Sequence, residues 1–270
     1  MKRFDNYLIA TDLDGTLYKN QNEIPKQNIE AIRRYISLGG KFTVATGRAV
    51  ISARRIIEGI DINCPVITCN GHILFDYDKD EIVDSIDLPE DIKDYAKKIY
   101  DKFPDAGIEA FNGKDIMIIR ANDVVRRHLS YEKVDIVDVP FAIAAEKPWQ
   151  KLLITDEEDG IKAIREYAKT IKPDSINILD TNRLFMEAGA IGVDKGSALL
   201  SLADHVGADR DKTFAIGNYY NDCEMINAAY LGACVADTPD DIKEMCGYVT
   251  KLTCSEGGFA EFVDFVMNMC

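Results

Sequence analysis

The sequence predicts an α/β protein in which a Rossmann-like core with a parallel sheet is interrupted by an inserted α+β domain. Short apolar runs alternate with helical patterns at the start of the 270-residue chain and again near its end. Strands that alternate with helices are typical of a parallel sheet with right-handed crossovers. The middle of the chain is richer in charge and changes in pattern. We therefore expect the core at residues 1–74 and 186–270, and the inserted domain at 75–185.

The first core segment contains three predicted strands and two predicted helices. The strands are short apolar runs, as expected where both faces of a strand are buried. The helices have apolar residues at roughly helical spacing, and two glycines after the first of them are a stop signal. In chain order we expect a strand at 7–11, a helix at 28–38, a strand at 42–46, a helix at 52–59 and a strand at 65–69.

The remaining elements support the same division. In the inserted domain, apolar stretches at 116–119 and 151–154 lie between helical segments, which favours an α+β unit. After Gly192 the core pattern resumes. There we expect a helix at 197–206, a strand at 213–216, a helix at 222–229 and a strand at 233–236.

The net charge of the chain limits the classes of partner that it is expected to bind. A formal net charge of −14 repels polyanions at long range, so we expect neither nucleic acid nor an anionic membrane as a partner. No apolar run approaches the length needed to cross a bilayer. An acidic protein that handles phosphate must build a local positive site from a metal ion, a lysine and backbone amides. The sequence makes no prediction of oligomeric state.

The cysteines indicate a reducing compartment. Their number is seven, which is odd, and they are scattered without a Cys-x-x-Cys pair. This pattern is typical of reduced, mostly buried thiols rather than of a disulfide framework or a zinc site. We therefore expect a cytoplasmic protein.

Polar residues cluster just past the carboxyl ends of the predicted core strands. Asp12 and Asp14 follow the first strand, Thr46-Gly47-Arg48 closes the second, and Asn70 follows the third. Asn218 and the pair Asn221-Asp222 follow the strand at 213–216. Because ligands of open α/β sheets bind at this edge, we expect these residues to line one crevice.

The segment Asp12-Leu13-Asp14-Gly15-Thr16 has two simpler interpretations. Asp-Gly is a strong turn signal, so the segment is compatible with a plain turn. Its acidic spacing also resembles a calcium loop. However, Leu17 stands where such a loop needs glycine, and a strand rather than a helix precedes it. We therefore discard calcium.

Four segments together resemble the sequence motifs of the haloacid dehalogenase (HAD) phosphatases. They are 12–16, 45–48, 192–196 and 217–222, and they occur in the family's order. The set resembles the Cof-like branch in particular, whose type IIB cap is inserted between the second and third motifs. The stretch 235–243 near the C-terminus also looks like that branch. The resemblance covers the core from end to end, but over the cap it concerns architecture alone.

The resemblance implies a phosphate-monoester phosphatase that depends on Mg²⁺. Asp12 would be the nucleophile that forms an aspartyl-phosphate. Asp14 would protonate the leaving alcohol and then take a proton from the hydrolytic water. Lys195 would complete the catalytic set and stabilise charge on the phosphoryl oxygens.

The resemblance also implies a phosphate-binding set. Arg48 has a second interpretation, since an arginine there could instead pair with a core carboxylate. Asn70 is similarly open, because its Asn-Gly dipeptide is compatible with a hinge turn. Glycine at position 47 lets the backbone approach the phosphate. The expected phosphate-binding residues are Thr46, Gly47, Arg48, Lys195 and Asn221.

The implied magnesium ligands depart from the family pattern at one position. The expected set is Asp12, the backbone carbonyl of Asp14, Asn218 and, through water and Lys195, Asp222. The family usually has aspartate where this chain has Asn218. An amide oxygen can bind a hard cation but lacks the negative charge, so weaker magnesium binding is expected.

This departure leaves alternatives open. The first is a working phosphatase, and the second is a binding or regulatory protein that recognises a phosphate ligand with little turnover. A third, phosphoryl transfer like that of the related phosphomannomutases, has no support from a sugar-bisphosphate motif in the cap. The substrate could be a sugar phosphate, a phosphorylated cofactor or a nucleotide. In the cap we expect Phe111 in the core, Trp149 as an anchor of a strand, and His128 as a surface histidine.

Overall fold

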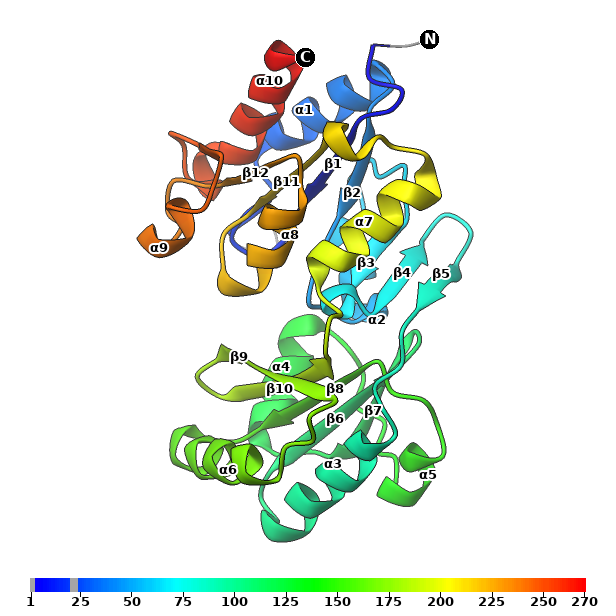
Figure 1. Ribbon diagram of the computed structural model, residues 1–270. Helices are drawn as coiled ribbons and strands as arrows, with labels where there is room; N and C mark the ends of the chain where they lie inside the picture. Colours follow the sequence, from blue (N-terminus) through cyan, green and yellow to red (C-terminus); the bar gives the residue numbers. More distant parts are fainter. Residues whose placement is uncertain (1–2, 20–23) are drawn as a thin grey trace. The chain divides into compact units, whose positions relative to one another are not determined.

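The computed structural model describes residues 3–19 and 24–270, which form two compact units (Figure 1). The core unit runs to Arg48, resumes at Ala53–Asp84 and ends with Asp194–Cys270. The inserted unit holds Ala49–Ser52 and Ser85–Val193. The core is therefore discontinuous in sequence, as predicted.

The core unit contains a five-stranded sheet in which all neighbouring strands are parallel. Its first strand, β1 (Leu8–Thr11), is an interior strand and pairs on one side with β11 (Thr213–Gly217), which comes from the last core segment. Residues of the central strands are buried, which explains why they read as continuous apolar runs. In spatial order the strands are β13 (Tyr248–Val249), β12 (Leu231–Cys234), β11 (Thr213–Gly217), β1 (Leu8–Thr11) and β2 (Lys41–Val44).

Helices cover both faces of this sheet (Figure 1). On one face Ile9 and Phe42 pack in a cluster with Ile32 of α1 and Phe262 of α10. On the other face Ala10 packs in a cluster with residues of α7 and α8. The core helices are α1 (Lys26–Ser37), α2 (Val50–Ile57), α7 (Lys195–Val206), α8 (Cys223–Ala228), α9 (Asp240–Lys243) and α10 (Gly258–Met269).

The third predicted strand belongs to a second, smaller sheet. β3 (Val66–Thr68) touches the parallel sheet through one isolated bridge between Ala45 and Ile67. Its main partner is β4 (Ile73–Asp76), which is antiparallel and leads into β5 (Glu81–Ser85). The predicted boundary at residue 74 falls inside β4. It is wrong because pairing with β3 keeps this hairpin in the core unit as far as Asp84.

The inserted unit is a five-stranded antiparallel sheet with four helices. The predicted boundary at residue 185 is also wrong, because it falls at the start of a strand that pairs with β8 and β9. The strands are β7 (Asp115–Arg120), β6 (Gly107–Asn112), β8 (Lys151–Thr155), β10 (Phe185–Ala190) and β9 (Ile176–Asn182). The helices are α3 (Asp91–Lys102), α4 (Asp123–Glu132), α5 (Phe141–Ala145) and α6 (Glu158–Ile171). The predicted α+β character is confirmed.

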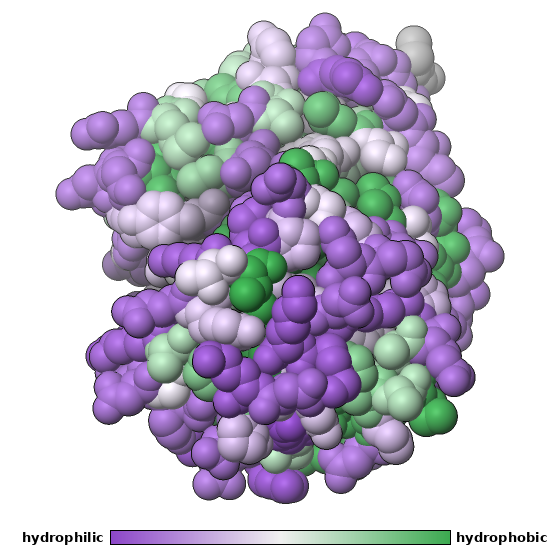
Figure 2. All heavy atoms as spheres, turned by 60° about the horizontal axis from the view of Figure 1, so that its bottom comes forward, coloured by the Kyte–Doolittle hydropathy of each residue, from purple (hydrophilic) through white to green (hydrophobic). Residues whose placement is uncertain are grey.

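The visible surface is mainly polar (Figure 2), and the cysteines differ in their burial. Figure 2 shows hydrophilic residues over most of the visible face, with apolar residues scattered among them. Over residues 3–19 and 24–270, no helix is long and apolar enough to cross a bilayer. Cys69, Cys234 and Cys254 are buried. The other four cysteines are partly or fully exposed, so the expectation of mostly buried thiols is wrong.

Candidate active site

Asp12 lies directly after β1, at the carboxyl edge of the parallel sheet. Its backbone N–H donates to the carbonyl of Ile216 at 2.9 Å, which extends the pairing of β1 with β11 by one residue. Its side chain is buried, and Oδ1 accepts a hydrogen bond from Lys195 Nζ at 2.6 Å. The ladder between these two strands therefore fixes where the carboxylate emerges.

Lys195 is the first residue of α7 and is fully buried. The helix begins with a reciprocal capping box between Asp194 and Ser197, which fixes the direction of its first turn. Nζ of Lys195 also donates to Oδ1 of Asp222 at 2.7 Å. The ammonium thus bridges two carboxylates that are far apart in the sequence.

These buried charges change the pKa values of Asp12 and Lys195. Burial and the neighbouring Asp222 charge raise the pKa of Asp12 to about 7, although Lys195 opposes the shift. Burial alone would lower the pKa of Lys195, but attraction by Asp12 and Asp222 raises it above its ordinary value. The lysine is therefore a fixed positive charge. A second cation beside Asp12 would favour its ionised, nucleophilic form.

Asp222 organises the loop that follows β11. Its carboxylate is fully buried, and Oδ2 accepts hydrogen bonds from the backbone N–H groups of Asn218 and Tyr219 at 2.9 and 3.0 Å. Together with the bond to Lys195, these contacts engage both oxygens. Asp222 therefore positions the lysine and the loop, and its support of a metal through water stays a prediction.

Asp14 is held by two side chains. Arg48 Nε and Nη2 donate to its two carboxylate oxygens at 2.7 and 2.8 Å in a bidentate pair. The hydroxyl of Tyr18 donates to Oδ1 at 2.9 Å. Arg48 thus pairs with a carboxylate, the second of its two predicted interpretations. Its role as a phosphate ligand stays a prediction.

Asn218 lies against the loop that carries Asp14. Its Oδ1 accepts a hydrogen bond from the Thr16 hydroxyl at 2.9 Å. Gly15 has φ +89°, and a Cβ there would come within 2.4 Å of the Asn218 amide nitrogen. Gly15 therefore serves both the turn conformation and the close approach of the two loops.

The donors at this edge suit a hard cation. They are a carboxylate of Asp12, the backbone carbonyl of Asp14 and the amide oxygen of Asn218, all oxygen ligands of the kind that Mg²⁺ binds. Asp12 and Asp222 share the one ammonium of Lys195, so such an ion would offset the remaining negative charge. In the described part of the chain, no three His, Cys, Asp or Glu side chains converge as a ready-made metal cluster. The predicted set accordingly depends on a backbone carbonyl and an amide.

The predicted phosphate-binding residues form a second connected group. The Thr46 hydroxyl accepts the Arg48 backbone N–H at 3.2 Å. A Cβ on Gly47 would come within 2.8 Å of Asn70 Oδ1, which accepts from Asn221 Nδ2 at 3.3 Å. Asn70 itself adopts φ 54° in a short 3-10 turn at Cys69–Gly71. The structure thus brings the open candidate Asn70 into the same cluster.

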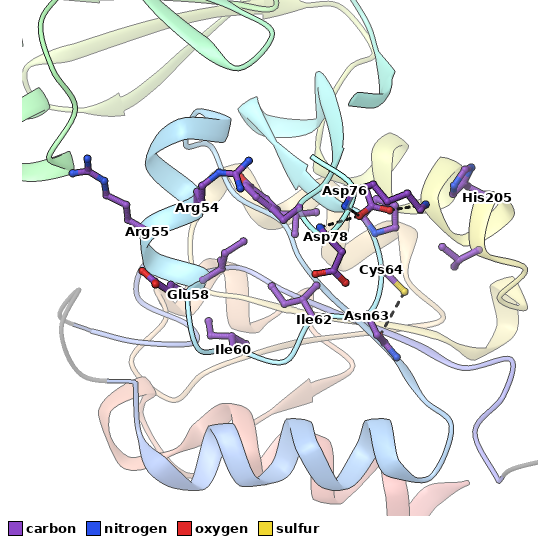
Figure 3. A pocket seen from close by; sticks show the side chains of 16 residues that line it. Arg54, Arg55, Glu58, Ile60, Ile62, Asn63, Cys64, Asp76, Asp78 and His205 are labelled. Carbon is purple, nitrogen blue, oxygen red and sulfur yellow. Dashed lines mark hydrogen bonds and ion pairs between the residues drawn. The ribbon is translucent and has the colours of Figure 1, made fainter. Parts of the chain in front are cut away.

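A separate cavity of about 780 Å³ opens elsewhere in the core unit (Figure 3). Arg54 of α2, Glu58 just after that helix, Asp76 at the end of β4 and His205 near the end of α7 line it, together with apolar residues such as Ile60. Among the described residues that line it there is no predicted site residue. Buried charge at the strand ends, rather than cavity size, marks the candidate active site.

The comparison with protein families decides the assignment. Residues 9–263 match the family model described as haloacid dehalogenase-like hydrolase. The chain belongs to this hydrolase family. The match spans the core and the insertion, and it includes every residue discussed above.

Individual relatives of the HAD hydrolase agree with this assignment. The chain is 25% identical over 255 residues to the 5-amino-6-(5-phospho-D-ribitylamino)uracil phosphatase YcsE of Bacillus subtilis, covering 94% of this chain and 93% of that protein. A haloacid dehalogenase-like hydrolase from Bacteroides thetaiotaomicron has a TM-score of 0.84 and 24% identity, covering 96% and 99% of the two chains. The HAD subclass IIB sugar phosphatase BT4131 has a TM-score of 0.82 and 21% identity, covering 96% and 98%. The predicted family, fold and phosphatase class are confirmed.

Sequence reasoning missed some contacts of the HAD site. Tyr18 was not among the candidates, because a tyrosine that follows an apolar residue is typical of the hydrophobic core. In the inserted unit, Phe111 and Trp149 are buried as predicted. The prediction of a surface position for His128 is wrong, because its ring is mostly buried between Glu109 and Glu132 at 3.4 and 3.3 Å.

Proposed function

We propose that this hydrolase is a magnesium-dependent phosphatase that cleaves small phosphate monoesters through an aspartyl-phosphate on Asp12. The observation that carries the proposal is the buried chain of contacts from Asp12 through Lys195 to Asp222. Asp14 follows Asp12 by two residues. This arrangement supports roles for Asp12 as nucleophile, Lys195 as fixed positive charge and Asp14 as acid/base group at one edge of the sheet.

The residues would act in two steps. Asp12 attacks phosphorus while Asp14 gives a proton to the departing alcohol. Water then attacks the aspartyl-phosphate, Asp14 takes up the proton, and Asp12 is released. Lys195 and the Thr46 hydroxyl stabilise the charge on the phosphoryl oxygens. Mg²⁺, held by Asp12, the Asp14 carbonyl and Asn218, would neutralise phosphate charge near the nucleophile.

The relatives support a small phosphorylated metabolite as substrate. Two of them are named for a ribitylaminouracil phosphate and for sugar phosphates. In both names the phosphate belongs to a small sugar or sugar-like molecule. We propose a sugar phosphate or a phosphorylated cofactor, handled in the cytoplasm. The net charge of −14 supports the absence of nucleic acid and membrane partners from this proposal.

Asn218 favours a second candidate function. The amide contributes no negative charge to the metal site, so the chain could bind a phosphate ligand and turn it over slowly. Such a protein would bind or regulate rather than catalyse. The intact contacts of Asp12, Asp14 and Lys195 favour the enzyme.

A magnesium titration tests both candidates. We expect wild-type protein to hydrolyse p-nitrophenyl phosphate only with Mg²⁺, and Asp12→Asn to be inactive. Asn218→Asp should bind Mg²⁺ about tenfold more tightly, since one added charge at a ligand contributes on the order of 1.4 kcal/mol. Titration calorimetry with Mg²⁺ alone measures this affinity independently of turnover.

Asn227→Asp is the matched control, because it adds the same charge at an exposed position of α8. It should leave magnesium affinity unchanged. Activity that appears only in Asn218→Asp would favour the binding protein. Full activity in Asp12→Asn would show that the nucleophile is assigned wrongly.

A further inference from the structure

The side chain of Asp14 combines exposure with firm support. Its side chain is 45% exposed, so substrate and water can reach it. Arg48, by contrast, is 9% exposed, and Tyr18 is 1% exposed. The carboxylate is therefore open on one side and held from within the protein on the other.

The two supporting side chains differ in what they can bind. A guanidinium has only donors, so its bidentate pair needs both oxygens of Asp14 as acceptors. A phenolic hydroxyl can donate or accept. When Asp14 carries a proton on Oδ1, the Tyr18 oxygen can accept a hydrogen bond from that O–H group. When the proton is on Oδ2, the Tyr18 hydroxyl still donates a hydrogen bond to Oδ1. Arg48 fits the ionised form, whereas Tyr18 fits both forms.

Tyr18 is also anchored independently of Arg48. Its ring packs in the core cluster that includes Leu13 and Leu17. Its carbonyl accepts the Gly15 N–H at 2.8 Å, and its own N–H donates to the Leu13 carbonyl at 3.2 Å. The loop that carries Asp14 therefore closes on the residue whose hydroxyl reaches back to the carboxylate.

We propose that Tyr18 is a positioning residue that holds the Asp14 carboxyl group in place for proton transfer to the leaving group. The inference rests on the proposed phosphatase function and extends it to a residue outside the four motifs. In the first step, the Asp12–phosphorus bond forms, the bond to the alcohol oxygen breaks, and that oxygen takes the Asp14 proton. In the second, the water oxygen bonds to phosphorus, its proton goes to Asp14, and the bonding pair returns to Asp12.

Leaving-group dependence separates positioning from simple structural support. The leaving group of a sugar phosphate or of glycerol 3-phosphate is an alkoxide that needs a proton, whereas p-nitrophenolate leaves without one. In Tyr18→Phe we expect kcat/KM for glycerol 3-phosphate to fall about tenfold or more. The upper limit of this loss is the roughly 10²–10⁴-fold that general acid catalysis contributes. For p-nitrophenyl phosphate, kcat/KM should fall about twofold at most, because that parameter reports the first step.

The ratio of the two kcat/KM values does not depend on the fraction of folded enzyme. Tyr35→Phe is the matched control, because Tyr35 is a fully buried tyrosine of the same cluster whose hydroxyl has no hydrogen-bond partner among the described residues. It should leave the ratio unchanged. Equal losses for both substrates in Tyr18→Phe, or no loss for either, would overturn the inference alone. Failure of wild-type protein to hydrolyse either substrate with Mg²⁺ would overturn the proposed function and the inference with it.

Discussion

Lys195 shows how one residue can serve both stability and chemistry. Its ammonium is fully buried, and two carboxylates at 2.6 and 2.7 Å compensate its charge. A buried charge with partners costs little, but a buried charge that loses its partner is expensive. The site is therefore sensitive to any change that removes the lysine charge and leaves Asp12 and Asp222 facing each other.

Lys195→Met should destabilise the core unit by about 3–5 kcal/mol in the absence of Mg²⁺, because it leaves two buried carboxylates without their cation. Urea unfolding followed by far-UV circular dichroism measures the loss. Lys212→Met is the control, since Lys212 pairs with Asp209 at the surface and should change the unfolding free energy very little. Similar effects of the two substitutions would contradict this account of the buried site.

Residue types at the site were predictable where they belong to motifs, and less so elsewhere. Asp12, Asp14, Lys195 and Asp222 could be named because they lie in four ordered segments that resemble the motifs of the HAD phosphatases. Tyr18 could not, because an aromatic residue in the interior has the same appearance whether or not its hydroxyl has a partner. Only coordinates show which oxygen it reaches.

At the scale of elements, helix α4 and strand β6 bring a buried charged cluster together in the inserted unit. His128 of α4 lies between Glu109 of β6 and Glu132 at the end of its own helix. Although burial opposes it, hydrogen bonding and attraction by the two glutamates raise the pKa of His128 to about 10. The imidazole is therefore charged at neutral pH. Burial also raises the pKa of Glu109, which favours the neutral form of this carboxyl and so works against the ion pair.

This cluster predicts a pH-dependent stability. Because the pKa of His128 rises on folding from about 6.5 to about 10, its contribution is complete below about 6.5, declines above it and is lost above about 10. The difference in unfolding free energy between wild type and His128→Gln should therefore shrink as pH is raised from 7 to 10. Chemical unfolding at a series of pH values checks this. A difference that stays constant, or grows, would contradict the pKa shift.

Element boundaries were harder to predict than element types. The run at 65–69 was correctly identified as a strand, but its pairing with the hairpin β4–β5 depends on contacts that a local pattern does not contain. The same holds for β10, whose partners β8 and β9 define the end of the inserted unit. Both predicted domain boundaries were placed inside strands for this reason.

At the scale of the whole molecule, the two units have separate hydrophobic cores. The chain contains one tryptophan, Trp149, which is buried in the core of the inserted unit. Its indole N–H donates to the carbonyl of Ala144 at 2.8 Å. Tryptophan fluorescence therefore reports on this unit, while circular dichroism reports on both.

The two signals should separate in Lys195→Met. The substitution lies in the core unit, so its urea transition by circular dichroism should acquire an early phase. The fluorescence transition of Trp149 should move much less. Coincident shifts of both signals would instead show that the two units unfold as one.

The discontinuous core also bears on how the protein is made. On a ribosome, β1 emerges before its parallel partner β11, which is synthesised about two hundred residues later. The inserted sheet consists of antiparallel strands between Ser85 and Val193, so all its partners are available earlier. Nascent β1 must therefore remain unpaired on that side until β11 has left the exit tunnel. Asp12, Lys195 and Asp222 can come together only after residue 222 has been made, so the catalytic contacts form after the inserted unit has been synthesised.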